Sequence, residues 1–345
     1  MSTRQALHYR PVIETMTDEL PTEAQGAELD SPDRRDGSVY HYDDELHLAV
    51  ELALSTGRPL LLRGEPGSGK SSLAAYVARN LGWRYYEHVV TSATQAQDLL
   101  WRYDAVRRLA DAQAQPGQQL NDFEYIEPGA LWWVFDPESA RRRGAPATGP
   151  QPKEAVEPNP DLNGSRAPDR AVVLVDELDK ADPDVPNALL VPLGSTRFHV
   201  DDVNIDVMRA PRSDPAAVRE PFSRLLVVIT TNEERELPPA FLRRCVVHKL
   251  VHPDAERLVE VARLHFERPD QPFDEDDVTL CWSIASRVEK LRQVAEAAVR
   301  RPPSTAEYLD AVRACRTLGI RVDSSAAWQA LEKVVLRKDD EEGPP

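Results

Sequence analysis

The residues of this chain that are best suited to chemistry begin with one glycine-rich stretch. Its members have the spacing G-x-x-x-x-G-K-[ST] and are Gly64, Glu65, Pro66, Gly67, Ser68, Gly69, Lys70 and Ser71, with Ser72 directly after them. Glycines let the backbone wrap a polyphosphate, because successive N–H groups and the start of a helix then face the anion. Lys70 is expected to reach the β- and γ-phosphates, and the Ser71 hydroxyl to hold Mg²⁺. The stretch therefore predicts a loop that binds a nucleoside triphosphate.

Two acidic residues, Asp176 and Glu177, follow the apolar run 171–175. At the end of a strand, Asp176 can hold Mg²⁺ directly or through water, and Glu177 can point at the γ-phosphate and polarise an attacking water. A nucleoside kinase needs no water-activating glutamate at this position. The pair favours ATP hydrolysis, and an acidic pair that merely starts a turn is the alternative.

Three further polar residues follow the strand predicted at 225–231. Asn232 can lie beside Glu177 and hydrogen-bond the same water or the γ-phosphate, or it can simply serve the turn. Arg243 and Arg244 come after a short helix, from where the chain's own loop is hard to reach. A neighbouring subunit's loop is within reach, and an arginine supplied in trans stabilises charge on the transferring phosphoryl group. The alternative is a pair of surface arginines in salt bridges.

The elements that must position these residues alternate between strands and helices. We predict strands at 60–62, 83–90, 171–176, 225–231 and 245–250, helices at 43–55, 73–81, 95–114, 186–193 and 239–244, and a hairpin at 197–207. This alternation indicates an α/β fold, with a parallel sheet between two layers of helices. Ligands bind at the carboxyl ends of such strands. The glycine-rich loop, the acidic pair and Asn232 should therefore converge there.

Residues 123–135 predict a short extended segment, a turn at Pro128-Gly129 and a helix that buries Trp132 and Trp133. The alternative for the two tryptophans is an exposed surface for a partner or ligand. From residue 252 onward the strand patterns stop. Helices are predicted at 254–266, 276–290, 293–300, 304–318 and 324–336, and residues 304–307 form a capping box. We therefore expect a core at 41–251 and a helical domain at 252–337, with a flexible arm at 1–40 and an acidic tail at 338–345.

Residues 136–170 hold seven prolines and no aromatic residue, and we expect a flexible insertion without a core.

Composition limits the partners and the compartment. The 345 residues carry a formal net charge of -16, which disfavours general binding to a nucleic acid backbone.

The three cysteines are far apart, which suggests buried thiols in a reducing compartment. Cys245, His248 and His252 lack a fourth ligand, and a strand would point the first two to opposite faces, so no metal is predicted there. No signal peptide or membrane-length apolar run is present. We expect a cytoplasmic protein with no membrane contact.

With these residues assembled, the chain resembles the MoxR-like branch of the AAA+ ATPases over residues 41–336. The stretch HYDDELHLAVELALSTGRPLLLRGEPGSGKSS resembles the entry to a Walker A motif, and VVLVDELDKADPDVPNALLVPL resembles a Walker B motif with its following helix. ITTNEERELPPAFLRRC resembles the sensor-1 strand and arginine-finger helix. The resemblance gives Asp176 and Glu177 the metal and catalytic positions, Asn232 the sensor-1 position, and Arg244 or Arg243 that of the finger.

Other segments extend this resemblance to a P-loop AAA+ core with a small all-α lid domain. YIEPGALWW resembles the region of the helix-2 insert, residues 197–207 the pre-sensor-1 insertion, and PPSTAEYLDAVRAC the start of the sensor-2 helix. Many AAA+ proteins carry a sensor-2 arginine inside that helix, whereas the corresponding turn here, residues 304–307, has the sequence STAE. The nearest candidates for a nucleotide contact from the lid are Arg300 and Arg301, of which we select Arg301.

The resemblance implies a homo-oligomeric ring, with a hexamer as the expected form, that binds ATP and Mg²⁺ between subunits. It implies a chaperone-like remodeller of a protein client, for which a von Willebrand factor A domain protein is a candidate. Three alternatives stay open: a DNA-directed motor or loader on the same core, a small-molecule P-loop kinase, and a nucleotide-binding scaffold with little catalysis.

Overall fold

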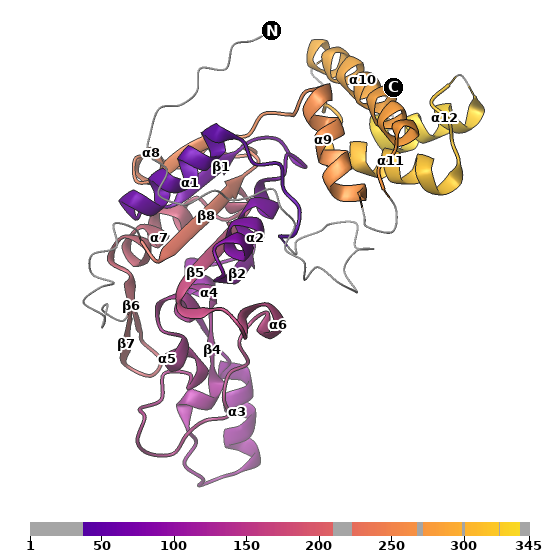
Figure 1. The fold of residues 1–345 in the computed structure, drawn as a ribbon. Helices are drawn as coiled ribbons and strands as arrows, with labels where there is room; N and C mark the ends of the chain where they lie inside the picture. Colours follow the sequence, from indigo (N-terminus) through magenta and orange to yellow (C-terminus); the bar gives the residue numbers. More distant parts are fainter. Residues whose placement is uncertain (1–36, 210–222, 268–271, 299–300, 324, 339–345) are drawn as a thin grey trace, which may run out of the picture. The chain divides into compact units, whose positions relative to one another are not determined.

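The computed structural model describes residues 37–209, 223–267, 272–298, 301–323 and 325–338 (Figure 1). Its contacts divide these residues into two units. The first contains residues 44–63 and the described part of 77–248, and the second contains residues 37–43, 64–76 and the described part of 249–338. No helix in the described ranges is both long enough and apolar enough to cross a membrane.

The first unit is built on a five-stranded sheet with the order β2-β5-β8-β1-β9. The strands are β1 (Leu60–Arg63), β2 (Trp83–Val89), β5 (Ala167–Asp176), β8 (Leu225–Thr231) and β9 (Val246–Lys249). The pairs β2–β5, β5–β8 and β1–β8 are parallel. The register places Val175 beside Ile229 and Arg63 beside Thr231, so neighbouring strands end at one edge of the sheet. The predicted parallel α/β fold is confirmed.

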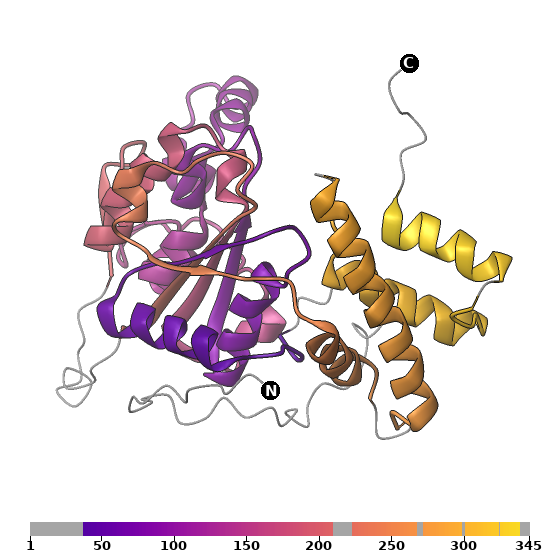
Figure 2. The same ribbon diagram turned by 90° about the horizontal axis from the view of Figure 1, so that it is seen from above.

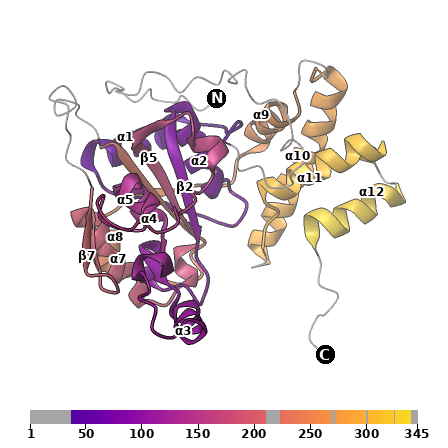
Figure 3. The same cartoon turned by 90° about the horizontal axis from the view of Figure 1, so that it is seen from below.

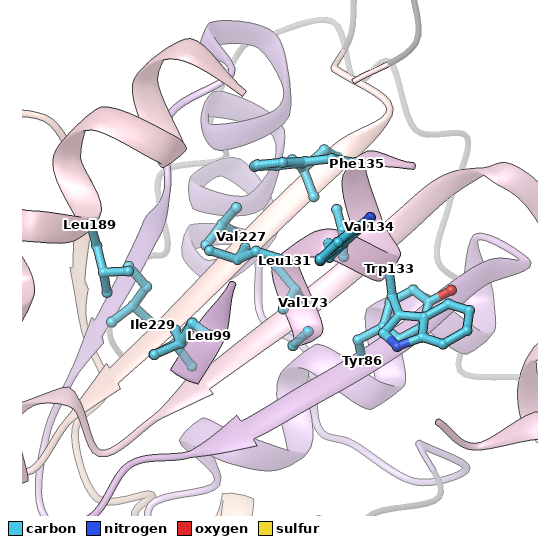
Figure 4. Close-up of a cluster of buried hydrophobic side chains, with 14 of the residues drawn as sticks. Tyr86, Leu99, Leu131, Trp133, Val134, Phe135, Val173, Leu189, Val227 and Ile229 are labelled. Atoms are coloured by element: carbon cyan, nitrogen blue, oxygen red, sulfur yellow. The ribbon is translucent and has the colours of Figure 1, made fainter. Parts of the chain in front are cut away.

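Both faces of the sheet are covered because its central strands, β1 and β8 and residues 171–175 of β5, are largely apolar. Helix α1 (Asp44–Thr56) lies along one face and α4 (Ala130–Phe135) lies against the other (Figure 2). Strand residues that alternate along the chain, such as Val173, Val227 and Ile229, form one core with α4 (Figure 4). Trp132 and Trp133 in α4 are fully buried, as predicted, and Trp133 lies beside Tyr86 of β2.

The predicted helix over 95–114 is wrong. The chain forms a 3₁₀ turn, η1 (Ala96–Leu99), then β3 (Trp101–Tyr103), and only then α3 (Ala105–Ala114). Strand β3 pairs antiparallel with β4 (Ile126–Pro128). The Asp104 side chain accepts a hydrogen bond from the N–H of Arg107 and so begins a new helix. The apolar residues that suggested one long helix therefore belong to different elements. Leu99 lies in η1 and is buried, whereas α3 buries no residue.

The expectation that residues 136–170 form no core is also wrong. They contain α5 (Pro137–Arg141), α6 (Pro160–Asn163) and the start of β5. The buried Asn163 side chain hydrogen-bonds the N–H and the carbonyl of Tyr85. Glu157 accepts hydrogen bonds from the Tyr86 hydroxyl and from Arg84. The segment is attached to β2 by polar side chains, which an apolar pattern does not reveal.

The predicted hairpin is confirmed. Strands β6 (Arg197–Val200) and β7 (Ile205–Met208) pair antiparallel after helix α7 (Asp184–Ser195). Phe198 stacks on Trp101 with ring centroids 5.7 Å apart, and the Trp101 indole N–H donates to Asp202. The remaining elements of this unit are η2 (Asp122–Tyr125), η3 (Leu178–Lys180) and α8 (Pro239–Leu242).

The second unit contains a helical bundle with its own apolar core (Figure 3). Its helices are α9 (Ala255–Phe266), α10 (Glu275–Ala297), α11 (Thr305–Leu318) and α12 (Ala326–Leu331), followed by a π-helical turn, Glu332–Arg337. The helices predicted at 276–290 and 293–300 are one helix, α10, because no proline or glycine interrupts them. Arg300 lies outside the described residues. The predicted capping box is confirmed: Ser304 and Glu307 bond each other's backbone N–H.

The predicted arm ends earlier than residue 40. Residues 37–40 belong to the second unit, where Gly37 has φ +69° and lies so close to Ala75 that a Cβ would fall 2.3 Å from its carbonyl oxygen. The Tyr40 ring lies 5.5 Å from that of Tyr76. Aromatic contact therefore orders these residues. Residues 1–36 of the arm and 339–345 of the tail lie outside the described chain.

Candidate active site

The glycine-rich loop starts directly after β1, and helix α2 (Lys70–Asn80) begins at its lysine. Gly67 and Gly69 have φ of +74° and +90°, which favours glycine at both positions. A Cβ on Gly67 would fall 2.6 Å from the Cβ of Ser304, so a side chain there would also clash. The loop needs these glycines for its conformation and for its close approach to α11.

Polar groups of the loop fit a polyphosphate. The buried Lys70 ammonium donates hydrogen bonds to the carbonyl oxygens of Gly64 and Glu65, at 2.8 and 2.7 Å. The Ser68 hydroxyl oxygen is buried and has no hydrogen-bond partner among the described residues. The N-terminus of an 11-residue helix, with Ser71 as its second residue, supplies further N–H groups toward an anion. A buried cation, an unsatisfied hydroxyl and a helix N-terminus together suit a nucleoside triphosphate.

The acidic pair lies at the end of β5, and Thr230 of β8 holds it in place. Asp176 is buried, and its Oδ1 accepts a hydrogen bond of 2.6 Å from the Thr230 hydroxyl. The Thr230 hydroxyl oxygen in turn accepts from the Glu177 N–H at 2.8 Å. Glu177 has φ +60°, in the left-handed region that non-glycine residues seldom adopt. Asp176 and Ser71 each offer the kind of oxygen ligand that Mg²⁺ prefers, and their role in holding the metal stays a prediction.

The structure brings Asn232 and Glu177 together across the two strand ends. The Asn232 amide nitrogen Nδ2 donates to Glu177 Oε1 at 3.0 Å. The Asn232 N–H donates to the carboxylate of Asp179, with distances of 3.1 and 3.3 Å to its two oxygens. A polar amide therefore touches the carboxylate that the sequence assigns to water activation.

Three residues of this site were missed by sequence reasoning: Thr230, Asp179 and Lys180. Thr230 and Asp179 are both buried polar residues, and Asp179 also accepts from the N–H of Glu234 at 2.9 Å. Lys180 Nζ lies 2.6 Å from Glu177 Oε2. The available signal was the charge spacing in the run DELDK, which puts Asp179 and Lys180 within one turn of the acidic pair.

The two candidate finger arginines lie just after α8. Both Arg243 and Arg244 are exposed, and the Arg243 carbonyl accepts a hydrogen bond from Arg58 at 3.1 Å. The backbone of this segment is thus anchored to the first unit while its two arginine residues face solvent. Their role in a neighbouring subunit's site stays a prediction.

Arg301 is engaged within the helical unit. Its guanidinium forms an ion pair of 3.0 Å with Glu307, the acidic residue of the capping box. Glu307 also pairs with Lys338 at 2.8 Å. Burial opposes ionisation of Glu307, but Lys338, the Ser304 N–H and Arg301 outweigh it and lower the pKa of Glu307. The predicted contact of Arg301 with a nucleotide would have to compete with this ion pair.

One protein-family model matches the part of the chain that holds most of the candidate site residues. The family model described as AAA domain (dynein-related subfamily) matches residues 59–245, a range that includes the glycine-rich loop, the acidic pair, Asn232 and both arginines. A search of curated proteins returned no significant match.

Two solved structures with similar folds are a RuvB Holliday junction branch migration motor and a candidate ATPase. The first, from Thermotoga maritima, has a TM-score of 0.41 and 13% identity, over 84% of this chain and 67% of its own. The second, from Cytophaga hutchinsonii, has a TM-score of 0.36 and 16% identity, over 84% of this chain and 79% of its own.

Proposed function

This chain belongs to the AAA domain family, in its dynein-related subfamily, and is an ATPase, and from that premise we propose that it is a chaperone-like remodeller of the MoxR type. The observation that carries the hydrolytic part is the contact between Asn232 Nδ2 and Glu177 Oε1, next to Asp176. An amide that holds a carboxylate at the end of neighbouring strands suits the orientation of a water for attack on a phosphoryl group.

In the proposed mechanism the loop binds ATP through Lys70 and the N–H groups at the start of α2. Bound Mg²⁺ would neutralise charge on the phosphates, with Ser71 and Asp176 as its protein ligands. Glu177 accepts a proton from water as the water oxygen bonds to the γ-phosphorus. The bond from that phosphorus to the β–γ bridging oxygen breaks, and ADP and phosphate result. Asn232 fixes the orientation of Glu177 during this step.

Two features support the finer assignment to the MoxR type. The hairpin β6–β7 lies where the sequence resembles the pre-sensor-1 insertion. Strand β4, which pairs with β3, lies within the segment 125–133 that resembles the region of the helix-2 insert. We propose a core at 41–251 and a lid at 252–337, both acting on a protein client, of which a von Willebrand factor A domain protein is one candidate class. The three cysteines are free and buried, which is compatible with the proposed cytoplasmic location.

We further propose assembly into a homo-oligomeric ring, with a hexamer as the expected form. AAA proteins commonly form rings, and the exposed Arg243 and Arg244 are available to a neighbour's site. The arginine that acts in trans would stabilise negative charge on the γ-phosphate. Arg244 is our first choice and Arg243 the second.

The alternative of a DNA-directed motor is disfavoured by the arginine run at 141–143. Arg141 pairs with Glu138 at 2.7 Å and with Glu157 at 3.6 Å. The Arg142 and Arg143 side chains hydrogen-bond backbone carbonyls of their own segment and of Ile126. The most basic run therefore makes contacts within the chain, and the net charge of -16 opposes a polyanion.

Substitution Glu177→Gln tests the proposed function. The variant should bind ATP with unchanged affinity but hydrolyse it at least about 100-fold more slowly, because a positioned general base contributes on that order. Fluorescent-nucleotide binding and phosphate release measure the two effects. Unaltered turnover would refute the role of Glu177. Stimulation of the wild-type ATPase by duplex DNA at physiological salt would favour the DNA motor over the remodeller.

A further inference from the structure

Lys180 reaches back onto Glu177 because of the turn that joins them. It is the last residue of η3 (Leu178–Lys180), and its N–H donates to the Glu177 carbonyl at 3.0 Å. In a 3₁₀ turn, residues i and i+3 lie one above the other. The Lys180 ammonium thereby reaches Glu177 Oε2 at 2.6 Å. This contact is set by local backbone geometry and is not a chance meeting of two long side chains.

Glu177 is consequently held on both carboxylate oxygens. Asn232 bonds Oε1 from the end of β8, and Lys180 bonds Oε2 from η3. Asp179 joins the two elements, because its carboxylate accepts from the N–H groups of Asn232 and Glu234. Two donors on different elements restrict rotation of the carboxylate more than either donor does alone.

We propose that Lys180 is a positioning residue for Glu177 and that ATP hydrolysis by this chain depends on its ammonium group. Lys180 holds the carboxylate in the orientation in which Asn232 also bonds it, so that the water meets a base with one fixed direction. The proposal rests on the proposed hydrolytic role of Glu177.

Neighbouring carboxylates favour the protonated form of Lys180, which is the form that donates to Glu177. The hydrogen bond with Glu177 raises the pKa of Lys180, and the nearby carboxylates of Glu234 and Asp179 add to this effect. The adjacent cation Arg235 donates to the Ala181 carbonyl. The Lys180 side chain is 39% exposed, so its ion pair contributes little to folding, and we expect the fold to tolerate its replacement.

The test compares Lys180→Met with Lys180→Arg in steady-state ATP hydrolysis. Lys180→Met should lower kcat about tenfold and leave KM within about twofold, because misplacing a catalytic group costs rate more than binding. Lys180→Arg, which retains a cationic donor, should restore most of kcat. In a Glu177→Gln background, Lys180→Met should lower the residual rate no further, since the two residues act as one unit. Lys153→Met, at an exposed lysine away from the site, is the matched control.

Several outcomes would overturn the proposal. These are an unchanged or higher kcat in Lys180→Met, a kcat in Lys180→Arg as low as in Lys180→Met, or a fall in kcat on adding Lys180→Met to Glu177→Gln as large as in the wild-type background. Lys180→Gln serves as a second neutral variant if the methionine variant unfolds. A crystal structure of Lys180→Met gives a readout without turnover. Glu177 is expected to leave Asn232, and a retained contact of 3.0 Å would count against the proposal even if the wild-type protein hydrolysed no ATP. Absent hydrolysis with a displaced Glu177 would instead refute only the proposed function.

Discussion

At the scale of single residues, the site depends on a few buried polar atoms that link neighbouring strand ends. The Thr230 hydroxyl donates to Asp176 and accepts from the Glu177 N–H, so one side chain sets the position of both acidic residues. Thr230 is completely buried, and water cannot replace these bonds without a rearrangement. Loss of this one hydroxyl should therefore disturb the positions of both Asp176 and Glu177.

Thr230→Val should lower both stability and turnover. Valine has nearly the shape of threonine but removes both hydrogen bonds, which should cost about 1–3 kcal/mol in free energy of unfolding. Turnover should fall more steeply than ATP affinity, because Asp176 and Glu177 lose their common support. Urea unfolding and phosphate-release assays measure the two effects. Thr230→Ser is the control that keeps the hydroxyl, and a Thr230→Val protein with normal stability and kcat would contradict this account.

At the scale of elements, the start of α11 combines a capping box with two ion pairs. The Ser304 side chain accepts from the Glu307 N–H, and Glu307 accepts from the Ser304 N–H. Arg301 and Lys338 both pair with the same carboxylate. These cations and the cap outweigh the cost of burial and lower the pKa of Glu307. The helix therefore begins at a carboxylate that stays ionised in mildly acidic solution.

Glu307→Gln should destabilise the protein at pH 7 but not in strong acid. A glutamine keeps the cap but loses the charge, and ion pairs with exposed partners are worth about 0.5–1 kcal/mol. Because the folded pKa is lowered, this stabilisation is complete above the unfolded value of about 4.3 and disappears as the pH falls through the folded pKa. The difference between the unfolding free energies of the two proteins, measured at successively lower pH from 7, should therefore shrink. A difference that stays constant over the whole acidic range would show that charge is not involved.

At the scale of the whole molecule, each of the two units has a core of its own. The first is organised around the sheet and α4, and the second around α9, α10, α11 and α12. The first unit presents Arg243 and Arg244 to solvent at the end of α8. The proposed ring uses this segment, because a site completed by a neighbour requires an accessible arginine.

Mixing two inactive variants tests completion in trans. Arg244→Ala should bind nucleotide but not hydrolyse it, and Glu177→Gln should behave likewise. In an equimolar mixture, a subunit with an intact glutamate can receive Arg244 from its neighbour, which should restore roughly a quarter of wild-type turnover if subunits mix randomly. Arg243→Ala is the matched control for the choice of arginine. No restored activity in mixed rings, or full activity of Arg244→Ala, would exclude Arg244 as the finger.

Much of this molecule follows from its sequence. The spacing of glycines and Lys70 predicts the phosphate loop, because that function needs only local backbone geometry. Apolar runs ending in polar residues predict the parallel strands, and the common edge follows from parallel pairing. Ser304 and Glu307 predict their own cap for the same local reason.

Only the tertiary structure decided what surrounds Glu177 and how residues 136–170 are held. Glu177 lies 53 to 55 positions from its partners Thr230 and Asn232, and no local pattern pairs residues at that separation. Asn163 and Glu157 attach their segment to β2 through side-chain hydrogen bonds, which hydrophobic periodicity does not detect. The sequence thus determined the phosphate loop and the sheet, because both obey local rules. The orientation of the Glu177 carboxylate depends on side chains that meet only after the chain has folded.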